Sequence, residues 1–249
     1  MSLALRNARQ AGFTLVELAI GMIIVGLLLG TSMMTLSAQY EQRNRSETTQ
    51  LLREVQESLL GFAIANGRLP CPAGADLTGI EKFAAAPECN ASEGFLPAIS
   101  LGLTPRDKEG YLLDAWGNRI RYAVATHVPD GSGAINPGEC PPTKTVAPDY
   151  AVCPVYTTAQ GLLSVGLSTL PKSWGAGNGM LQVCSSSCAG TEHAVAAAAW
   201  STGRDAVGAP ENTDGDTTYI YPSEGESDDM IVWISQYTLF SRMRAASAL

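Results

Sequence analysis

The sequence has little of what most enzymes and nucleic-acid-binding proteins need. It has only two histidines, His127 and His193, and neither lies in a recognisable catalytic pattern. Because no G-x-S-x-G, P-loop or G-x-G-x-x-G motif occurs, a serine elbow and the common nucleotide folds have no support. Runs of lysine and arginine are missing, and a formal net charge of -8 disfavours general binding to phosphate backbones. We therefore expect no enzymatic activity.

Cysteine pairs with C-x-x-C spacing are also absent, although the chain has six cysteines. Their even number, together with an export-like N-terminus, favours three disulfides in an oxidising compartment over a metal site or a redox motif. Pairing between sequence neighbours, 71 with 89, 140 with 153 and 184 with 188, is the simplest connectivity, and the sequence does not decide it. The six residues are Cys71, Cys89, Cys140, Cys153, Cys184 and Cys188.

Acidic side chains are absent before Glu17, and no charged side chain of either sign occurs from Leu18 to Tyr40. These 23 residues would extend over about 34 Å as a helix, enough to cross the apolar core of a bilayer. Only Arg6 and Arg9 are charged in the first twelve residues, and basic flanks stay on the cytoplasmic side. Without those twelve residues, 16 − 2 = 14 basic groups face 24 acidic groups, a charge of -10.

Three kinds of N-terminal segment compete to explain this pattern, and the two ordinary ones are a secretory signal and a simple membrane anchor. A secretory signal would be cut after a small residue, such as Ala38 in Leu36-Ser37-Ala38, but the apolar run exceeds the usual ~7–15 residues. A simple membrane anchor leaves Glu17 unexplained, because a lone carboxylate in lipid costs at least about 2.5 kcal/mol. A glutamate at the membrane edge, solvated by lipid headgroups, is the plainest alternative for that residue.

The stretch GFTLVELAIG at residues 12–21 closely resembles the cleavage motif of type IV prepilins and type II secretion pseudopilins. The resemblance implies a leader of residues 1–12, removed by a prepilin peptidase after Gly12, and N-methylation of the new terminus, Phe13. It also implies that the apolar helix is kept, first as a membrane anchor and then as the core of a filament.

The resemblance also gives Glu17 a role. Cleavage would leave the charged amine of Phe13 within hydrocarbon, and Glu17 lies one helical turn further along the chain. Opposite charges in a low dielectric offset each other, whereas either charge alone is costly. The resemblance implies that the glutamate neutralises the amine of a neighbouring subunit during assembly.

The sequence after Tyr40 predicts an amphipathic continuation of the same helix. Apolar residues recur there at three- and four-residue steps, and Asn66-Gly67 followed by Pro70 is a good helix end. We therefore expect a membrane-spanning and filament-core helix at 13–40, an amphipathic half at 41–66 and a disulfide-containing globular head at 67–249. The expected fold class is α+β and pilin-like, with the long N-terminal helix packed on an antiparallel β-sheet of the head.

Short segments bounded by glycine, proline or asparagine predict that sheet. Residues 68–118 are typical of a loop-rich connection with a short helix near Lys82, and alternation predicts a half-buried strand from Ile120 to Val124. The alanine run at 196–199 could be strand or helix. The further strand candidates are 150–156, 161–167, 179–184, 194–201 and 230–235, and Tyr237, Phe240 and Met243 are expected to line one side of a C-terminal helix.

Asp114 and Trp116 could suggest a catalytic site, but a structural role is favoured. An aspartate before a Gly-Asn turn is suited to hold backbone amides, and a tryptophan beside it is suited to cap the core. The segment around them is similar to the one through which pseudopilin heads enter their sheet.

The acidic segment at 211–230 is the main candidate for a ligand site. Asp214, Asp216 and Asp228 offer hard oxygen ligands, and Gly215 allows a tight turn, so the segment is suited to Ca²⁺, although EF-hand spacing is absent. Pseudopilins, which this chain resembles, can hold calcium in a late loop. A solvated, self-repelling acidic loop is the alternative. No other cofactor is expected.

Together these features predict a structural subunit, a minor pilin or pseudopilin of a type IV pilus or a type II secretion filament. The resemblance implies four partners: a prepilin peptidase, an inner-membrane assembly platform, other pilin or pseudopilin subunits, and membrane lipid before assembly. It implies a single-pass inner-membrane protein with a cytoplasmic leader and a periplasmic head, later part of a periplasmic or surface filament. Protein secretion, cell adhesion, motility and DNA uptake stay open as its task. The alternative is a membrane-anchored extracytoplasmic binding or adhesin module.

Overall fold

The computed structural model describes residues 14–76, 78–85, 88–125, 181–185, 193–215, 217–221 and 227–246, and only the backbone at 28–36, 84, 85, 88, 193, 194 and 211. The chain divides into two compact units, residues 1–45 and 46–249, which are described separately below. Helix α1 (Leu15–Asn66) contributes its first part to unit 1 and its last part to unit 2.

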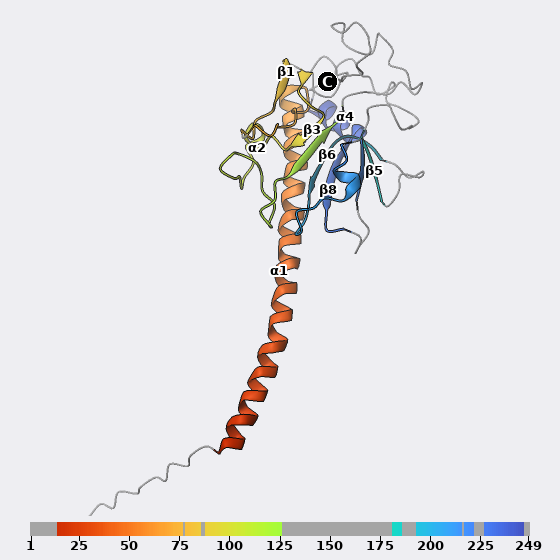
Figure 1. Ribbon diagram of the computed structural model, residues 1–249. Coiled ribbons are helices and arrows are strands. Elements are labelled where there is room, and N and C mark those ends of the chain that lie inside the picture. The colour runs from red at the N-terminus through yellow and green to blue at the C-terminus, as the bar shows by residue number, and fades with distance from the viewer. Residues whose placement is uncertain are drawn as a thin grey trace, which may run out of the picture. The chain divides into compact units, whose positions relative to one another are not determined.

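Unit 2, the head, is built on a mixed sheet of six strands (Figure 1). Hydrogen-bonded neighbours follow the path β3-β4-β6-β5-β7, and β8 also pairs with β6. The strands are β3 (Glu93–Phe95), β4 (Arg121–Val124), β5 (Leu181–Cys184), β6 (His193–Ser201), β7 (Thr218–Ile220) and β8 (Met230–Ser235). The predicted α+β fold class is therefore confirmed. The predicted strands at 120–124, 179–184, 194–201 and 230–235 are present within one or two residues, whereas 150–156 and 161–167 lie outside the described residues.

The sequence predicted a purely antiparallel sheet, but the observed sheet is mixed. All described pairs of the large sheet are antiparallel except β5 with β7, which run parallel. Parallel neighbours need a long crossover rather than a tight hairpin, and here the chain passes through β6 between them. Short strands flanked by turn residues do not reveal such a crossover, so the expectation was wrong at this pair.

The helix expected near Lys82 is also wrong. That segment leads into β1 (Phe83–Ala85), which pairs antiparallel with β2 (Glu88–Cys89). The Lys82 amide donates to the Pro72 carbonyl (3.2 Å), and the Lys82 carbonyl accepts from Asn90 (3.1 Å), so both backbone groups are already bound in an extended conformation. A short isolated helix is marginal in water and cannot compete with these bonds. The short helix of this region is α2 (Ala98–Leu101).

The amphipathic part of α1 packs on the sheet with one face. Its buried side chains recur at three- and four-residue steps, and each contributes about 1.5–3 kcal/mol when it is removed from water. They lie in one core cluster with residues of β4, β5, β6 and β8. The buried apolar residues of this face are Leu52, Val55, Leu59, Leu60 and Ala63.

Helix α4 (Gln236–Ala245) follows β8 directly, and Ser235 caps it by accepting a hydrogen bond from the Thr238 amide. Phe240 and Met243 are buried as expected, but Tyr237 is 53% exposed. The buried positions are 236, 239, 240 and 243, a spacing that fits one helical face and leaves position 237 turned away from it.

The turn before β4 is tied to both α1 and β6. Asp114 accepts hydrogen bonds from the Trp116 amide (2.9 Å) and the Asn118 amide (2.8 Å), as predicted, and from the Ser201 hydroxyl (2.6 Å). The buried Thr48 of α1 accepts from the Ala115 amide (3.2 Å). Trp116 is half-buried at the turn, and its expected role in capping the core stays a prediction.

Candidate functional site

The first turn of α1 holds the glutamate that the sequence singled out. Glu17 lies in this turn and is exposed, and its backbone amide donates to the Thr14 hydroxyl oxygen (3.3 Å). The Leu18 amide donates to the Thr14 carbonyl (3.1 Å). Thr14 thus caps the helix from the position just before it. Glu17 follows three residues later, the spacing of a capping box, so T-x-x-E before an apolar run was a signal that the sequence analysis missed.

The described apolar side chains that follow lie on the surface of unit 1. Nine of them are between 52% and 86% exposed, which is unusual for a soluble monomer. Exposed surface of this kind and extent needs an apolar partner, because each such side chain gains about 1.5–3 kcal/mol on burial. The nine are Leu15, Val16, Leu18, Ile20, Met22, Ile23, Ile24, Val25 and Leu27.

Comparison with known protein families places a motif on this segment. Residues 7–33 match the model of the prokaryotic N-terminal methylation motif. The chain carries the type IV prepilin-type signature. Comparisons with curated proteins and with solved structures gave no match.

The prepilin-type signature supports a type IV pilin or pseudopilin and indicates a structural protein. It implies processing by a prepilin peptidase, assembly with other pilins and a membrane-anchored N-terminus. Gly12 and Phe13, the predicted cleavage and methylation residues, lie outside the described residues.

Across the part of the chain that the structure describes, none of the helices combines the length and the apolarity needed to cross a bilayer.

The C-terminal end of α1 is fixed to the head by a second group of residues, named here the helix-exit cluster: Arg68, Cys71, Glu81, Cys89 and Tyr122. The helix ends at Asn66 as predicted, and Gly67 adopts the left-handed conformation (φ 68°) that a C-terminal cap requires. The Gly67 amide donates to the Ala63 carbonyl (2.8 Å), so the chain turns away from the helix axis at this residue.

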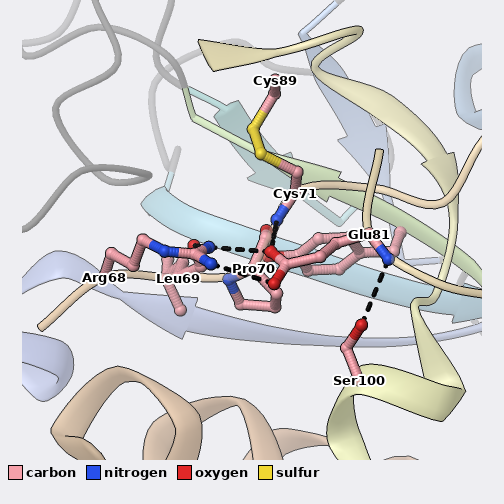
Figure 2. Close-up of a disulfide and its surroundings, with 8 residues drawn as sticks. Arg68, Leu69, Pro70, Cys71, Glu81, Cys89 and Ser100 are labelled. Atoms are coloured by element: carbon pink, nitrogen blue, oxygen red, sulfur yellow. Dashed lines mark hydrogen bonds and ion pairs between the residues drawn. A yellow bond between two sulfur atoms is a disulfide. The ribbon is translucent and has the colours of Figure 1, made fainter. Parts of the chain in front are cut away.

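Arg68 and Glu81 form the centre of the helix-exit cluster (Figure 2). The two guanidinium nitrogens donate to the two carboxylate oxygens at 2.7 and 2.9 Å, and the side chains are only 19% and 12% exposed. The guanidinium also lies over the rings of Phe62 (5.2 Å) and Phe83 (5.4 Å). Planar, two-pronged pairing of this kind is specific to arginine, since the point charge of a lysine cannot reproduce it.

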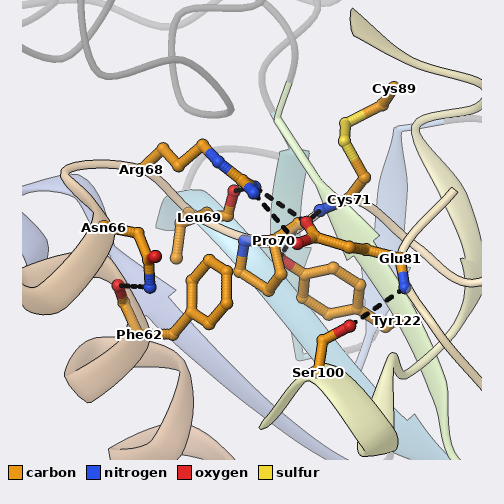
Figure 3. Close-up of polar contacts among 10 residues, drawn as sticks. All are labelled: Phe62, Asn66, Arg68, Leu69, Pro70, Cys71, Glu81, Cys89, Ser100 and Tyr122. Carbon is orange, nitrogen blue, oxygen red and sulfur yellow. Dashed lines mark hydrogen bonds and ion pairs between the residues drawn. A yellow bond between two sulfur atoms is a disulfide. The ribbon is translucent and has the colours of Figure 1, made fainter. Parts of the chain in front are cut away.

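Backbone groups around this ion pair are bound by the same residues (Figure 3). The Glu81 carboxylate accepts from the Cys71 amide (3.1 Å), and the Glu81 amide donates to the Ser100 hydroxyl (3.2 Å). The buried Tyr122 of β4 donates its hydroxyl to the Pro70 carbonyl (3.1 Å). Burial raises the pKa of Tyr122 well above its ordinary value, so the hydroxyl stays protonated and remains a donor. The Leu69 and Pro70 carbonyls and the Cys71 amide are therefore each held by a hydrogen bond.

The disulfide of the helix-exit cluster is the first of the predicted neighbour pairs. Cys71 and Cys89 are joined, with 18 residues of separation, and both are buried. Cys184 is disulfide-bonded too. Cys140, Cys153 and Cys188, one of which is its partner, lie outside the described residues, so the other two predicted pairs stay predictions.

The structure describes only part of the predicted calcium site in the acidic segment. Asp214 is exposed, and Asp216 lies outside the described residues. Asp228 accepts from the Arg204 amide (2.6 Å) and the Asp205 amide (3.2 Å), which holds the loop after β6. Among described residues, no group of three or more histidine, cysteine or acidic side chains is arranged to hold a metal. Calcium binding by Asp214, Asp216 and Asp228 stays a prediction.

Asn212 and Asp229 make a buried polar pair beside this loop. The Asn212 side chain accepts from the Ile220 amide (2.7 Å) and donates to the Ile220 carbonyl (3.0 Å), as a neighbouring strand would. It also donates to Asp229 (2.8 Å), whose same oxygen accepts from the Ala209 amide (2.8 Å). The other Asp229 oxygen is buried and has no hydrogen-bond partner among the residues that the structure describes. Both residues lie in the acidic segment at 211–230, but their pairing was not predicted.

We expect Asp229→Asn to stabilise the head at neutral pH. Burial, reinforced by the charges of Asp228 and Asp205, raises the pKa of Asp229 above its ordinary 3.8 despite the hydrogen bonds from Ala209 and Asn212. The native state therefore binds the proton more tightly than the unfolded chain, so the stability contributed below pH 3.8 is lost as pH rises through the folded pKa. An asparagine keeps the accepting oxygen without the buried charge.

Chemical denaturation of the full chain at pH 4 and pH 7 measures this effect. The gain of Asp229→Asn over the wild type should be larger at pH 7 than at pH 4. Asp228→Asn is the control, because Asp228 is more exposed and holds backbone amides instead. A loss of stability at pH 7 for Asp229→Asn would mean that the ionised carboxylate has a stabilising cationic partner.

Proposed function

We propose that this chain is a minor pilin or pseudopilin, a structural subunit of a type IV pilus or a type II secretion filament. The observation that carries the proposal is the methylation motif at residues 7–33, which contains Glu17 in the first turn of α1. In this proposal a prepilin peptidase cuts after Gly12, and the amine of Phe13 is methylated. The chain is inserted in the inner membrane with its leader in the cytoplasm and its head in the periplasm.

The exposed apolar surface of α1 supports a role in polymerisation. A helix with large apolar side chains on all sides is unstable in water, but it is stable in lipid and equally stable among identical helices. Moving from the membrane into a filament core therefore exchanges one apolar environment for another. The residual cost lies in the polar groups at the start of the helix, which are the Phe13 amine and the Glu17 carboxylate.

Pairing these two groups across subunits would remove that cost. A charged amine or a lone carboxylate in hydrocarbon is expensive, and removing one partner of such a pair costs about 3–5 kcal/mol. Each incoming subunit would thus be drawn to the axial position where its amine meets a glutamate. The head, joined to α1 through the helix-exit cluster, would be carried to the filament surface and to the partners recognised there.

The buried Cys71–Cys89 disulfide is consistent with a periplasmic head, because disulfides persist in oxidising compartments. The head of about 200 residues is large for a subunit that only repeats, which favours a minor component. Secretion and surface-pilus roles differ in the partners of the head. Deletion of the gene distinguishes them: it should abolish protein secretion if the chain is a pseudopilin, and twitching, adhesion or DNA uptake if it is a minor pilin.

Mass spectrometry of the mature N-terminus tests this proposal directly. We expect the protein isolated from membranes of its own host to begin at Phe13 with one methyl group on its amine. The same chain expressed without a prepilin peptidase should keep Met1 or Ser2 and serves as the control. A mature start at Gln39, which a secretory cut after Ala38 would give, contradicts the proposal, and so does an unprocessed chain in the native host.

A further inference from the structure

Strands β4 and β5 are neighbours of the same edge of β6. Residues 197–200 of β6 pair with β8 on one side and with β4 on the other. Val195 pairs with Ser235 of β8 and with Leu181 of β5. Because a strand has only one neighbour on each side, β4 and β5 both lie on the side of β6 that faces away from β8.

The two strands also follow each other in register without a gap. In β4 the pairing runs from Arg121 opposite Trp200 to Val124 opposite Ala197, and the Ala125 amide donates to the Ala196 carbonyl (2.8 Å). In β5 it continues with Leu181 opposite Val195. Both strands run antiparallel to β6 and therefore point in the same direction. Leu181 occupies the position that the residue after Ala125 would take in an uninterrupted strand.

We infer that β4 and β5 are two halves of one strand, and that residues 126–180 are an insertion that the head does not need in order to fold. The insertion has 180 − 125 = 55 residues. The core residues on both sides of the joint, Tyr122, Val124, Leu181 and Val183, belong to one cluster.

The inference has a consequence for assembly, which rests on the proposed function. The methylation motif, α1 and the helix-exit cluster all lie outside residues 126–180. The mature chain would then consist of a filament-forming scaffold, 13–125 joined to 181–249, and an accessory segment that the scaffold carries. It follows that a subunit without the insertion still enters filaments.

The inference also divides the cysteines. Cys71 and Cys89 are paired with each other, and Cys140 and Cys153 lie within the insertion. An insertion that is independent of the scaffold must keep its own cysteines paired. Cys184 of β5, which is disulfide-bonded, must then be joined to Cys188.

The test is a variant that lacks only residues 126–180, so that Ala125 is joined directly to Leu181. It is expressed in cells that supply the export pathway and the prepilin peptidase, and it is purified in detergent. A second version with a Gly-Gly link guards against strain at the joint. We expect a single cooperative unfolding transition and no free thiol after denaturation, in at least one of the two versions. Two free thiols, from Cys184 and Cys188, or loss of cooperative unfolding in both versions would overturn the inference.

A control deletion shows that the register matters. Joining Ala125 to Gln182 removes one residue more and moves all of β5 by one position, which places a polar amide where Leu181 packs. This variant should unfold at clearly lower denaturant concentration than the direct Ala125–Leu181 joint. Equal stability of the two variants would mean that β5 is not the continuation of β4.

Recovery in sheared filaments separates this inference from the proposed function. The shortened subunit should be recovered at a level within about twofold of the wild type. A folded but unincorporated variant beside an incorporated wild type would overturn the assembly half of the inference and leave the proposed function intact. Failure of the wild type itself to enter filaments would refute the proposed function, while the thiol and unfolding results would still decide the folding half.

Discussion

Replacing Glu17 with glutamine is expected to leave the chain processed and membrane-bound but to abolish its recovery in filaments. Glutamine has nearly the same shape and the same helix propensity, so α1 itself should form as before. In the proposed function, what it lacks is the charge that would offset the Phe13 amine in the apolar filament core. An unpaired buried charge costs about 3–5 kcal/mol, which lowers the equilibrium constant for incorporation by a factor of about 10² to 4 × 10³.

Immunoblotting of the membrane fraction and of sheared filaments measures both parts of this prediction. Glu54→Gln is the matched control, because Glu54 is an exposed glutamate of the same helix in the head. Normal incorporation of Glu17→Gln would contradict the pairing mechanism. The alternative of an anchored adhesin or binding module predicts that substitution of Glu17 leaves the function of the head intact, since a tether needs no charge at that position.

Substitution of Arg68 by methionine should destabilise the head by about 2–3 kcal/mol. The methionine keeps much of the apolar contact with Phe62 and Phe83, but it leaves the Glu81 carboxylate with its charge unpaired in a site that is only 12% exposed. Removing one partner of a buried pair costs more than the pair contributes, and partial exposure reduces the penalty here to below the 3–5 kcal/mol of a fully buried case. Denaturant unfolding of the full chain in detergent, followed by tryptophan fluorescence, gives the value.

A second substitution separates the charge from the packing. In Arg68→Met/Glu81→Gln the side-chain oxygen of the glutamine still accepts the hydrogen bond from the Cys71 backbone amide, and no charge is left unpaired. About half of the lost stability should therefore return. Arg53→Met, an exposed arginine of the same helix, should cost less than about 0.5 kcal/mol. If the double variant is as unstable as Arg68→Met alone, the ion pair is not the source of the effect.

The parts of the molecule that local sequence determines were predicted well. The end of α1 at Asn66 and the strands β6 and β8 each depend on residues within a few positions of each other. The hydrogen-bonding role of Asp114 belongs to the same class, because an aspartate before a Gly-Asn turn has its partners two and four residues away. Such local rules operate before the chain has any tertiary structure.

The parts that depend on distant residues were missed. The parallel pairing of β5 with β7 and the in-line placement of β4 and β5 are set by β6, which lies after a long stretch of chain. Glu81 reaches Arg68 only because β1 and the disulfide turn the segment back on α1. Neither carries a periodic pattern that a single sequence would reveal. The strand in place of the Lys82 helix has the same cause.

The Asn212 side chain gives Ile220 of β7 both of the hydrogen bonds that an adjoining strand would otherwise supply. A second copy of the head that approached this margin would find the donor and the acceptor of Ile220 already occupied. Exposed strand margins are where folded domains join into unwanted aggregates. Asn212 therefore closes this margin of β7 at Ile220. In the proposed function, copies of the chain meet through the exposed apolar side chains of α1 instead.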